Sequence, residues 1–197
     1  MISMERLKKQ MEFALEADKE KYIFRQTHLS DGRAENDAEH AWHMALMIYL
    51  LKEYSDEKID VARSMAMALI HDLVEIDAGD TYAYDEKGAI GKEERERKAA
   101  ERIFGILPEE QKKEFMELFY EFEERVTPEA RFARLMDNIQ PLMLNDSHNG
   151  ADWRSRGIKK SQVKKRQSGN ELASETLADY ANMLIERNVE KGNLVDE

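Results

Sequence analysis

The chain has 197 residues, with 30 Lys or Arg against 41 Asp or Glu, and a formal net charge of −11. Charged residues make up 36% of it, and only 9 Gly and 3 Pro occur, which favours long helices with charged surfaces over a turn-rich β protein. The negative charge argues against a nucleic-acid polymer or an anionic membrane as a partner of the whole surface, and the lack of Cys excludes disulfides, thiolate metal sites and Cys nucleophiles.

The N-terminal segment is charged and lacks the apolar run of a signal peptide. No stretch approaches the roughly 20 apolar residues of a membrane span. We therefore expect a soluble, cytoplasmic protein. Its length fits a single domain over residues 1–197.

Apolar residues recur every three to four positions along most of the chain, which is typical of helices that bury one face. We expect irregular pieces over residues 20–36, 77–91 and 148–157, and strands are hard to place anywhere. The pattern therefore predicts an all-α helical bundle with a core over about 5–147 and a C-terminal helix over about 158–190. The predicted helices cover residues 3–19, 37–54, 57–76, 92–105, 109–125, 128–147 and 158–190.

Helix-start signals agree with this map. Asn36 followed by Glu39 resembles a capping box, and Pro108 and Thr127-Pro128 each precede acidic residues at a helix start. Three apolar stripes are expected to face the core. They are Ala62, Met65, Ala66, Leu69, Ile70 and Leu73; Phe115, Leu118, Phe119, Phe122 and Val126; and Phe132, Leu135, Met136, Ile139 and Met143.

Four residues that could bind a metal lie in these helices: His40, His71, Asp72 and Asp137. Asp72 and Asp137 adjoin core stripes, where a carboxylate is costly unless charge or hydrogen bonds compensate it. A divalent cation would supply that compensation. Two imidazoles and two carboxylates suit Mn²⁺, Co²⁺, Fe²⁺, Ni²⁺ or Zn²⁺, and suit Mg²⁺ less well.

The order of these residues resembles the H…HD…D signature of the HD-domain superfamily. The surrounding residues are similar to the bacterial 5′-deoxynucleotidases and related small HD-domain hydrolases over roughly residues 5–145. The matching segments are Glu35-Asn36, Glu39-His40, His71-Asp72-Leu73-Val74-Glu75, Gly79-Asp80 and Asp137.

This resemblance implies an HD-domain helical bundle, usually dimeric, in which His40, His71, Asp72 and Asp137 hold one divalent metal ion. It also implies hydrolysis of nucleoside 5′-monophosphates to nucleoside and phosphate. We therefore expect a small nucleotide substrate, a homodimer, and neither a polymeric nucleic acid nor a membrane as partner. His40 would lie one turn into its helix, where the helix dipole favours the neutral imidazole that ligates metals.

Glu75 and Asp80 are the predicted catalytic pair. In a continuous helix Glu75 would share one face with His71 and Asp72, where it could handle a proton beside the metal. Asp80 follows Gly79 in a predicted turn, where the family pattern places a second catalytic carboxylate. Which of the two activates water stays open.

Cationic residues upstream of His40 are candidates for binding the substrate phosphate. The resemblance assigns this contact to Arg25, and Arg33 lies in the same segment. The residue after Arg25 is Gln26, where the bacterial deoxynucleotidases typically carry Trp, so strict selectivity for deoxyribose is in doubt. A run of seven basic residues without an acid, from Arg154 to Arg166, flanks either the site or a partner, or is a solvated helix face.

Two further predictions concern single residues. Pro141 removes the backbone hydrogen bond to Asp137, which predicts a kink or irregularity at the fourth ligand. Trp42 and Trp153 are read as packing residues, and His43 as a partly buried polar residue.

Two alternative functions remain. One is an HD phosphohydrolase acting on another phosphorylated metabolite or a diester, although the Gly-Tyr-Pro element of the cyclic-dinucleotide relatives is missing from the sequence. The other is a non-catalytic nucleotide-binding HD module, against which the presence of both Glu75 and Asp80 argues.

Overall fold

The computed structural model describes residues 3–85 and 87–197. Residues 1 and 2 of the expected domain, and residue 86 of the expected irregular piece 77–91, lie outside the described residues. Most of the described chain is helical, which confirms the all-α class. The helices are α1 (Met4–Ala17), α2 (Asp37–Leu51), α3 (Val61–Ile70), α4 (Glu75–Ala78), α5 (Lys92–Phe104), α6 (Glu109–Glu124), α7 (Pro128–Ser147), α8 (Ala151–Arg156), α9 (Lys160–Gln167) and α10 (Glu175–Glu190).

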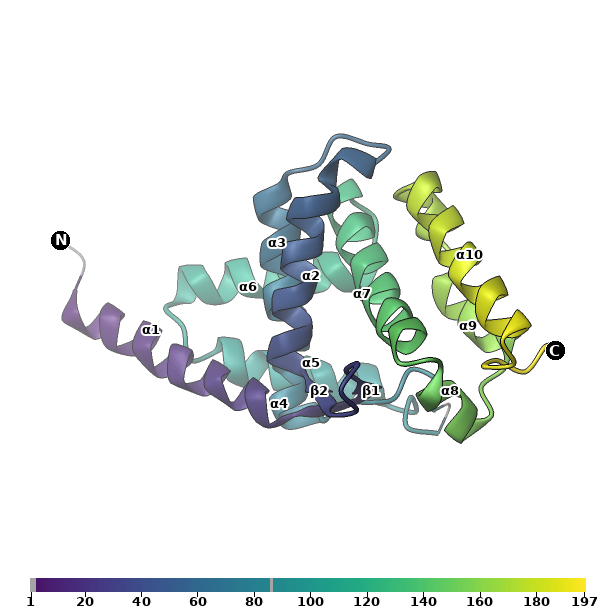
Figure 1. Cartoon of the computed structure of the whole chain (residues 1–197). Coiled ribbons are helices and arrows are strands. Elements are labelled where there is room, and N and C mark those ends of the chain that lie inside the picture. Colours follow the sequence, from purple (N-terminus) through teal and green to yellow (C-terminus); the bar gives the residue numbers. More distant parts are fainter. Residues whose placement is uncertain (1–2, 86) are drawn as a thin grey trace.

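Helices α2, α3 and α7 pack against one another at the centre of the molecule (Figure 1). α6 packs on α3 and α7, while α9 and α10 pack on the opposite side of α7. α1 extends to one side of the bundle (Figure 1). No helix in the described part of the chain is long and apolar enough to cross a membrane.

The predicted starts of α2 and α7 are confirmed, whereas α3 begins at Val61 and not at 57. The Asn36 side chain accepts from the backbone N–H of Glu39, and the Glu39 side chain accepts from the N–H of Asn36, which completes the capping box of α2. At α7, Thr127 accepts from the N–H of Ala130, and Pro128 is the first helical residue. These caps fix where the two helices that carry His40 and Asp137 begin.

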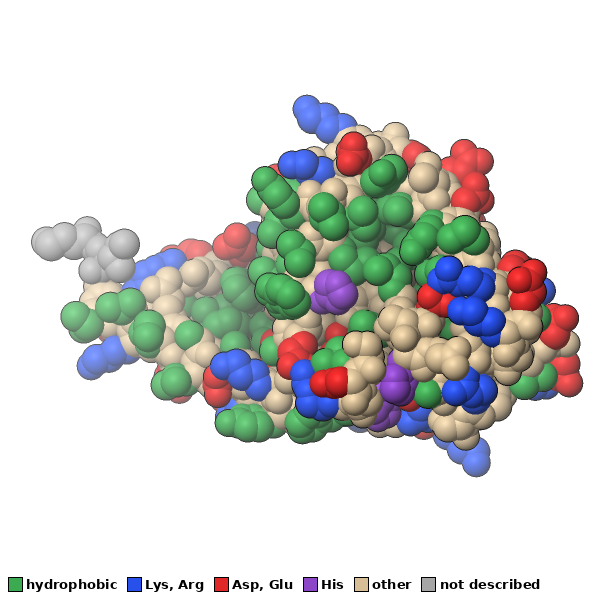
Figure 2. All heavy atoms as spheres, viewed as in Figure 1, with side chains coloured by type: hydrophobic (Ala, Val, Ile, Leu, Met, Phe, Trp, Pro, Cys, Tyr) green, Lys and Arg blue, Asp and Glu red, His purple; other side chains and the backbone are tan. Residues whose placement is uncertain are grey.

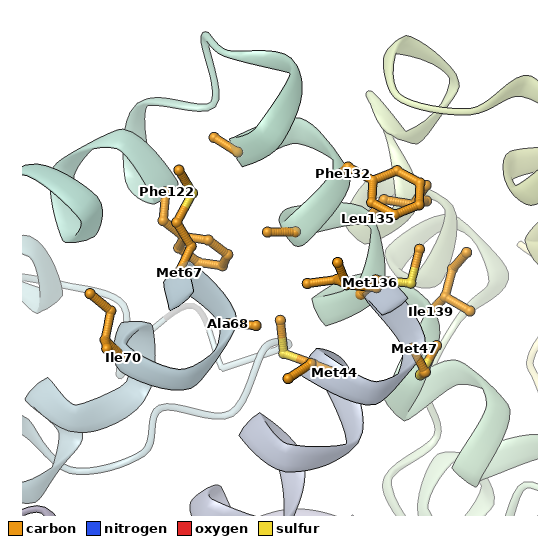
Figure 3. Packing of buried hydrophobic residues seen from close by; sticks show 14 of the residues in the cluster. Met44, Met47, Met67, Ala68, Ile70, Phe122, Phe132, Leu135, Met136 and Ile139 are labelled. Atoms are coloured by element: carbon orange, nitrogen blue, oxygen red, sulfur yellow. The ribbon is translucent and has the colours of Figure 1, made fainter. Parts of the chain in front are cut away.

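The stripe predicted on α7 forms the middle of the core. Phe132, Leu135, Met136 and Ile139 are at most 1% exposed and pack against Met residues of α2 and α3 (Figure 3). Burying this stripe holds the polar positions between its members, including Asp137, at a fixed place in the bundle.

The stripe predicted on α3 is partly wrong. Leu69 is 46% exposed, whereas Met67 and Ala68 are fully buried, together with Ser64. α3 is apolar on two sides, so periodicity could not choose the side that faces α2, α6 and α7. Val126 is also exposed, because α6 ends at Glu124 before reaching it.

The helix predicted over 57–76 ends as an α-helix at Ile70. A 3-10 turn, His71–Val74, follows, and the short α4 then ends at Gly79, whose positive φ of 76° favours glycine. The His71-Asp72 pair therefore lies in a tightened turn and not on a regular α-helical face.

The expected irregular piece 20–36 contains an antiparallel hairpin of β1 (Phe24–His28) and β2 (Ala34–Asn36). The pairing sets Phe24 opposite Asn36 and His28 opposite Ala34. Both strands are short and largely polar, so they carry no alternating apolar pattern that would reveal them. The hairpin carries Arg25 toward the centre of the bundle, beside α7.

The single helix predicted over 158–190 is wrong, because the structure has α9, a bend at Gly169 and then α10. Gly169 has a φ of 89°, which breaks the helix, and Ser174 caps the start of α10. α8 occupies most of the expected irregular piece 148–157.

One cluster of buried residues extends from Phe13 to Leu194. The single-domain assignment stays a prediction that this cluster favours.

Pro141 lies inside α7, which continues through it from Pro128 to Ser147. Because proline has no N–H, the carbonyl of Asp137 lacks the usual intrahelical donor. The kink expected at this point stays a prediction.

Candidate metal centre

His40 is completely buried on α2, and its two ring nitrogens have different neighbours. Nδ1 lies 2.9 Å from Oε1 of Gln140, and Nε2 lies 3.1 Å from Oδ1 of Asp137. The Gln140 amide N–H group donates to Glu35 at 2.5 Å and contacts His43 Nδ1 at 3.2 Å, so its oxygen faces His40. His40 therefore donates from Nδ1 and turns the lone pair of Nε2 toward Asp137. Burial lowers the pKa of His40 to about 4, which keeps the ring neutral.

His71 is held by the backbone of its own turn. Its Nδ1 lies 2.9 Å from the carbonyl oxygen of Ala68, and its ring packs on Phe122 with 4.5 Å between centroids. Nε2 is buried without a hydrogen bond and lies 3.0 Å from Oδ1 of Asp72. Although burial opposes it, the Asp72 carboxylate raises the pKa of His71 to about 9. At neutral pH such a ring holds a proton on Nε2 facing Asp72, and a cation bound at Nε2 would replace that proton.

In Asp72 and in Asp137, the carboxylate oxygen that faces away from the histidines is paired with arginine. Oδ2 of Asp72 accepts from Arg25 at 2.8 Å. Oδ2 of Asp137 lies 3.0 Å from Arg134 Nη1 and 3.1 Å from Arg166 Nη2. Burial opposes ionisation, but His71 lowers the pKa of Asp72, and the two arginines lower that of Asp137 well below its usual range. Both carboxylates are held as anions.

These four residues suit a divalent metal ion. Ligand atoms of His40, His71 and Asp72 lie within 4.8 Å of one another, and Asp137 adjoins His40. A cation there would satisfy the unpartnered Nε2 of His71. The outer nitrogens are oriented by Gln140 and by the Ala68 carbonyl, as is usual for metal-bound histidines. The mixed nitrogen and oxygen donors fit transition metals or Zn²⁺ better than Mg²⁺.

Glu75 and Asp80 line the same pocket as His71, Asp72 and Asp137, although the 3-10 turn replaces the expected common helical face. Glu75 is 4% exposed, its Oε2 has no hydrogen-bond partner among the described residues, and Lys92 lies 4.0 Å from its Oε1. Burial, followed by the charge of Asp72, raises the pKa of Glu75 well above its usual value. Burial raises the pKa of Asp80 as well. The pocket therefore offers two carboxyl groups beside the metal position whose neutral forms are favoured by burial.

The two arginines predicted to bind substrate lie in different surroundings. Arg25 lines the pocket, and its Nη1 donates to Asp37 at 3.1 Å as well as to Asp72. Arg33 is exposed and forms an ion pair with Glu39, and it is not among the described residues that line the pocket. The substrate role of Arg33 stays a prediction.

A family model described as HD domain matches residues 17–177. The chain belongs to the HD domain family. This confirms the resemblance drawn from the motifs. The HD domain is also similar to a crystal structure titled as a predicted metal-dependent phosphohydrolase from Magnetospirillum magnetotacticum, at 47% identity and a TM-score of 0.93, over 99% of this chain and 100% of that one.

Two curated relatives are named as 5′-deoxynucleotidases. The human protein HDDC2 is 32% identical over 111 residues, which cover 56% of this chain and 53% of that protein. The Schizosaccharomyces pombe protein hdd1 is 29% identical over 117 residues, or 56% of each chain. The HD domain described here thus matches about half the length of these curated relatives.

Sequence reasoning did not single out Gln140 or Arg166 of this HD domain site, although Arg166 ends the basic run that was expected to flank the site or a partner. Gln140 lies three residues after Asp137 on α7, so its helical spacing could have suggested it. Arg166 comes from α9, 29 residues beyond Asp137, and only the packing of α9 on α7 brings it there. Trp42, read as a packing residue, is 63% exposed, whereas Trp153 is buried as expected.

Proposed function

We propose that this HD domain is a metal-dependent phosphohydrolase that converts (deoxy)nucleoside 5′-monophosphates to nucleoside and phosphate. The observation that carries the proposal is the convergence of His40, His71, Asp72 and Asp137 beside a pocket that is also lined by Glu75, Asp80 and arginines. The printed names of the relatives, 5′-deoxynucleotidase and predicted metal-dependent phosphohydrolase, support the same reaction class.

When bound, a divalent ion supplies Lewis acidity toward water and toward a phosphate oxygen. The proposed ion is one of Mn²⁺, Co²⁺, Fe²⁺, Ni²⁺ or Zn²⁺, held by the two histidines and two aspartates. His40 and His71 bind through Nε2, because each Nδ1 is occupied by a hydrogen bond.

Glu75 and Asp80 handle the protons in this proposal. A buried carboxyl whose pKa is raised holds its proton near neutral pH and can donate it to a leaving 5′-oxygen. Arg25 offsets negative charge on the phosphate from the side of Asp72. Which of the two acids activates water stays open, as does the preference for base and sugar.

Phosphate release from a panel of ribo- and deoxyribonucleoside 5′-monophosphates, with Mn²⁺, Co²⁺ and Mg²⁺ compared, tests the proposal. We expect turnover of at least one monophosphate with Mn²⁺ or Co²⁺, and weaker turnover with Mg²⁺. Bis-phosphodiesters and cyclic nucleotides serve as the comparison substrates. If the metal-loaded protein turns over none of the monophosphates, the nucleotidase assignment is overturned. If it hydrolyses diesters alone, the protein is instead an HD phosphohydrolase that acts on diesters.

We also propose that the chain forms a homodimer through the outer face of α2. Trp42, Leu46, Tyr49 and Leu50 are 46–65% exposed on this face. Figure 2 shows hydrophobic side chains gathered over α2. A contiguous exposed apolar patch is typical of a protein interface. The molar mass measured by light scattering for the wild type and for Trp42→Glu tests this: we expect a dimer that the substitution converts to a monomer.

A cytoplasmic location and the absence of nucleic-acid or membrane partners stay predictions from composition. The basic run over 154–166 does not favour a nucleic-acid or membrane partner, because most of its members are paired with acids or carbonyl groups of the same chain.

A further inference from the structure

The basic run over residues 154–166 is not uniform, and Arg166 differs from its neighbours. Lys159 and Lys160 form ion pairs with acids near the C-terminus, and Lys164 pairs with Glu186 of α10. These side chains lie on the outside of the molecule. Arg166, in contrast, lines the pocket, and its side chain is 21% exposed.

Arg166 and a second arginine, Arg134, contact the same carboxylate oxygen of Asp137. Nη2 of Arg166 lies 3.1 Å from Oδ2 of Asp137, and Nη1 of Arg134, one turn before Asp137 on α7, lies 3.0 Å from that oxygen. Among the described residues, Asp137 is the one acidic partner of either guanidinium. Nε of Arg134 is buried and makes no hydrogen bond to any described residue.

Two positive charges thus share one carboxylate whose other oxygen faces His40. The two guanidinium groups lie on the same oxygen of Asp137 and repel each other, so one carboxylate leaves an excess of positive charge at this place. Burying like charges together is typical of a site that binds an opposite charge in its functional state.

The position of the two arginines relative to the metal ligands indicates which kind of anion they bind. Arg25 lies on the outer oxygen of Asp72, and Arg134 with Arg166 lies on the outer oxygen of Asp137. Guanidinium groups therefore flank the predicted ligand cluster on both aspartate sides. Planar guanidinium forks match the oxygens of a phosphate group, and they bind it more strongly when it carries two negative charges.

We propose that Arg134 and Arg166 form a phosphate clamp, which binds the terminal dianionic phosphate of the substrate and then the inorganic phosphate product. This inference rests on the proposed phosphohydrolase function and deepens it by selecting phosphomonoesters over diesters. A diester carries one negative charge and a second bulky substituent at the place where the clamp needs free oxygens.

The test compares Arg166→Gln with Lys164→Gln, which removes the same charge from the same helix outside the pocket. KM and kcat are measured for the best monophosphate substrate, the Ki for inorganic phosphate as a product inhibitor, and bound metal by elemental analysis. We expect Arg166→Gln to raise KM and the phosphate Ki about tenfold or more, the scale of a lost charge-assisted hydrogen bond, with bound metal unchanged. Lys164→Gln should match the wild type, and Arg166→Lys should fall between the two.

The opposite result is a KM and a phosphate Ki within twofold of wild type for Arg166→Gln, with or without a loss of metal. That outcome would make Arg166 a structural partner of Asp137 and would overturn the clamp. If Arg166→Gln does not fold, Arg134→Gln and Arg166→Lys carry the same test through the phosphate Ki.

The clamp and the proposed function can fail separately. Calorimetric titration of the metal-loaded wild type with inorganic phosphate measures the clamp without turnover. Phosphate binding that is weakened in Arg166→Gln supports the clamp even if no nucleotide is hydrolysed. Turnover of monophosphates with an unaltered phosphate affinity in the variant supports the function and rejects the clamp.

Discussion

We call Asp72 and Asp137 the base of the pocket and Glu75 and Asp80 its wall, and the pKa values of these two pairs of carboxyl groups are shifted in opposite directions. All four carboxyl groups line one pocket. The pKa is lowered for both residues of the base and raised for both residues of the wall. Burial acts in the same direction on all four, so their partners decide the outcome.

The partners differ in distance and number. Asp72 lies within 3.0 Å of both His71 and Arg25, and Asp137 contacts His40 and two arginines. Among the described residues, Glu75 has one ion-pair partner, Lys92 at 4.0 Å, and the charge of Asp72 repels it. The base thus favours charged carboxylates, which can bind a cation, and the wall favours neutral carboxyl groups. Four predictions test this division, from the largest expected effect to the smallest.

Removing a carboxylate from the base should abolish metal binding. In Asp137→Ala, we expect the loss of most of the bound metal and of phosphate release down to the rate of metal-free protein, because one of four ligands is gone. Elemental analysis and the phosphate assay measure this. Asp146→Ala, on the same helix but in a partly buried ion pair with Arg187 outside the pocket, is the control. Full metal content in Asp137→Ala would remove Asp137 from the ligand set.

Removing a proton-holding acid from the wall should leave the metal in place. Glu75→Gln is expected to lower kcat by about 10²–10⁴-fold with metal content unchanged, because the amide keeps the shape but cannot donate or accept the proton. Asp77→Asn, two residues later on α4 and in an exposed pair with Arg102, is the matched control. Metal lost from Glu75→Gln would instead place Glu75 at the base.

The base also depends on residues behind it. Gln140→Leu removes the acceptor for His40 Nδ1, so the ring is free to rotate or to change tautomer, and metal affinity is expected to fall about 10- to 100-fold. Competition with a chelator measures the affinity. Equal affinities for the wild type and the Leu variant would show that packing alone orients His40.

Glu20 extends the comparison beyond the pocket. It is 7% exposed, its Oε1 has no partner among the described residues, and burial raises its pKa to about 8. Because the folded state prefers the neutral form, the wild type loses stability as the pH rises from the ordinary carboxyl pKa toward 8. Glu20→Gln should therefore gain stability relative to the wild type as the pH rises from 4 to 8, with little difference between the two proteins near pH 4.

Chemical denaturation of the metal-free proteins at the two pH values measures this difference. Glu16→Gln is the control, because Glu16 is only partly buried, is ion-paired with Lys19 and Arg102, and has a lowered pKa. A difference between wild type and Glu20→Gln that does not change with pH would show that Glu20 is compensated in solution.

The central helices and the metal ligands could be predicted because their signals are local or ordered along the chain. The capping box at Asn36 and the stripe from Phe132 to Ile139 depend on residues within a few positions of one another. His40, the His71-Asp72 pair and Asp137 were recognisable from their order and from the costly position of carboxylates beside core stripes. The sequence by itself therefore determined the helical class, the family and the candidate ligands.

Only the tertiary structure decided which partner each buried acid receives. The buried side of α3 at Met67, the 3-10 turn at His71 and the break at Gly169 depend on how neighbouring helices pack. Arg166 reaches Asp137 because α9 folds back onto α7, and no local pattern encodes that approach. Electrostatic energies depend on distances of a few ångströms between residues far apart in the chain, so the division between the base and the wall of the pocket arises only on folding.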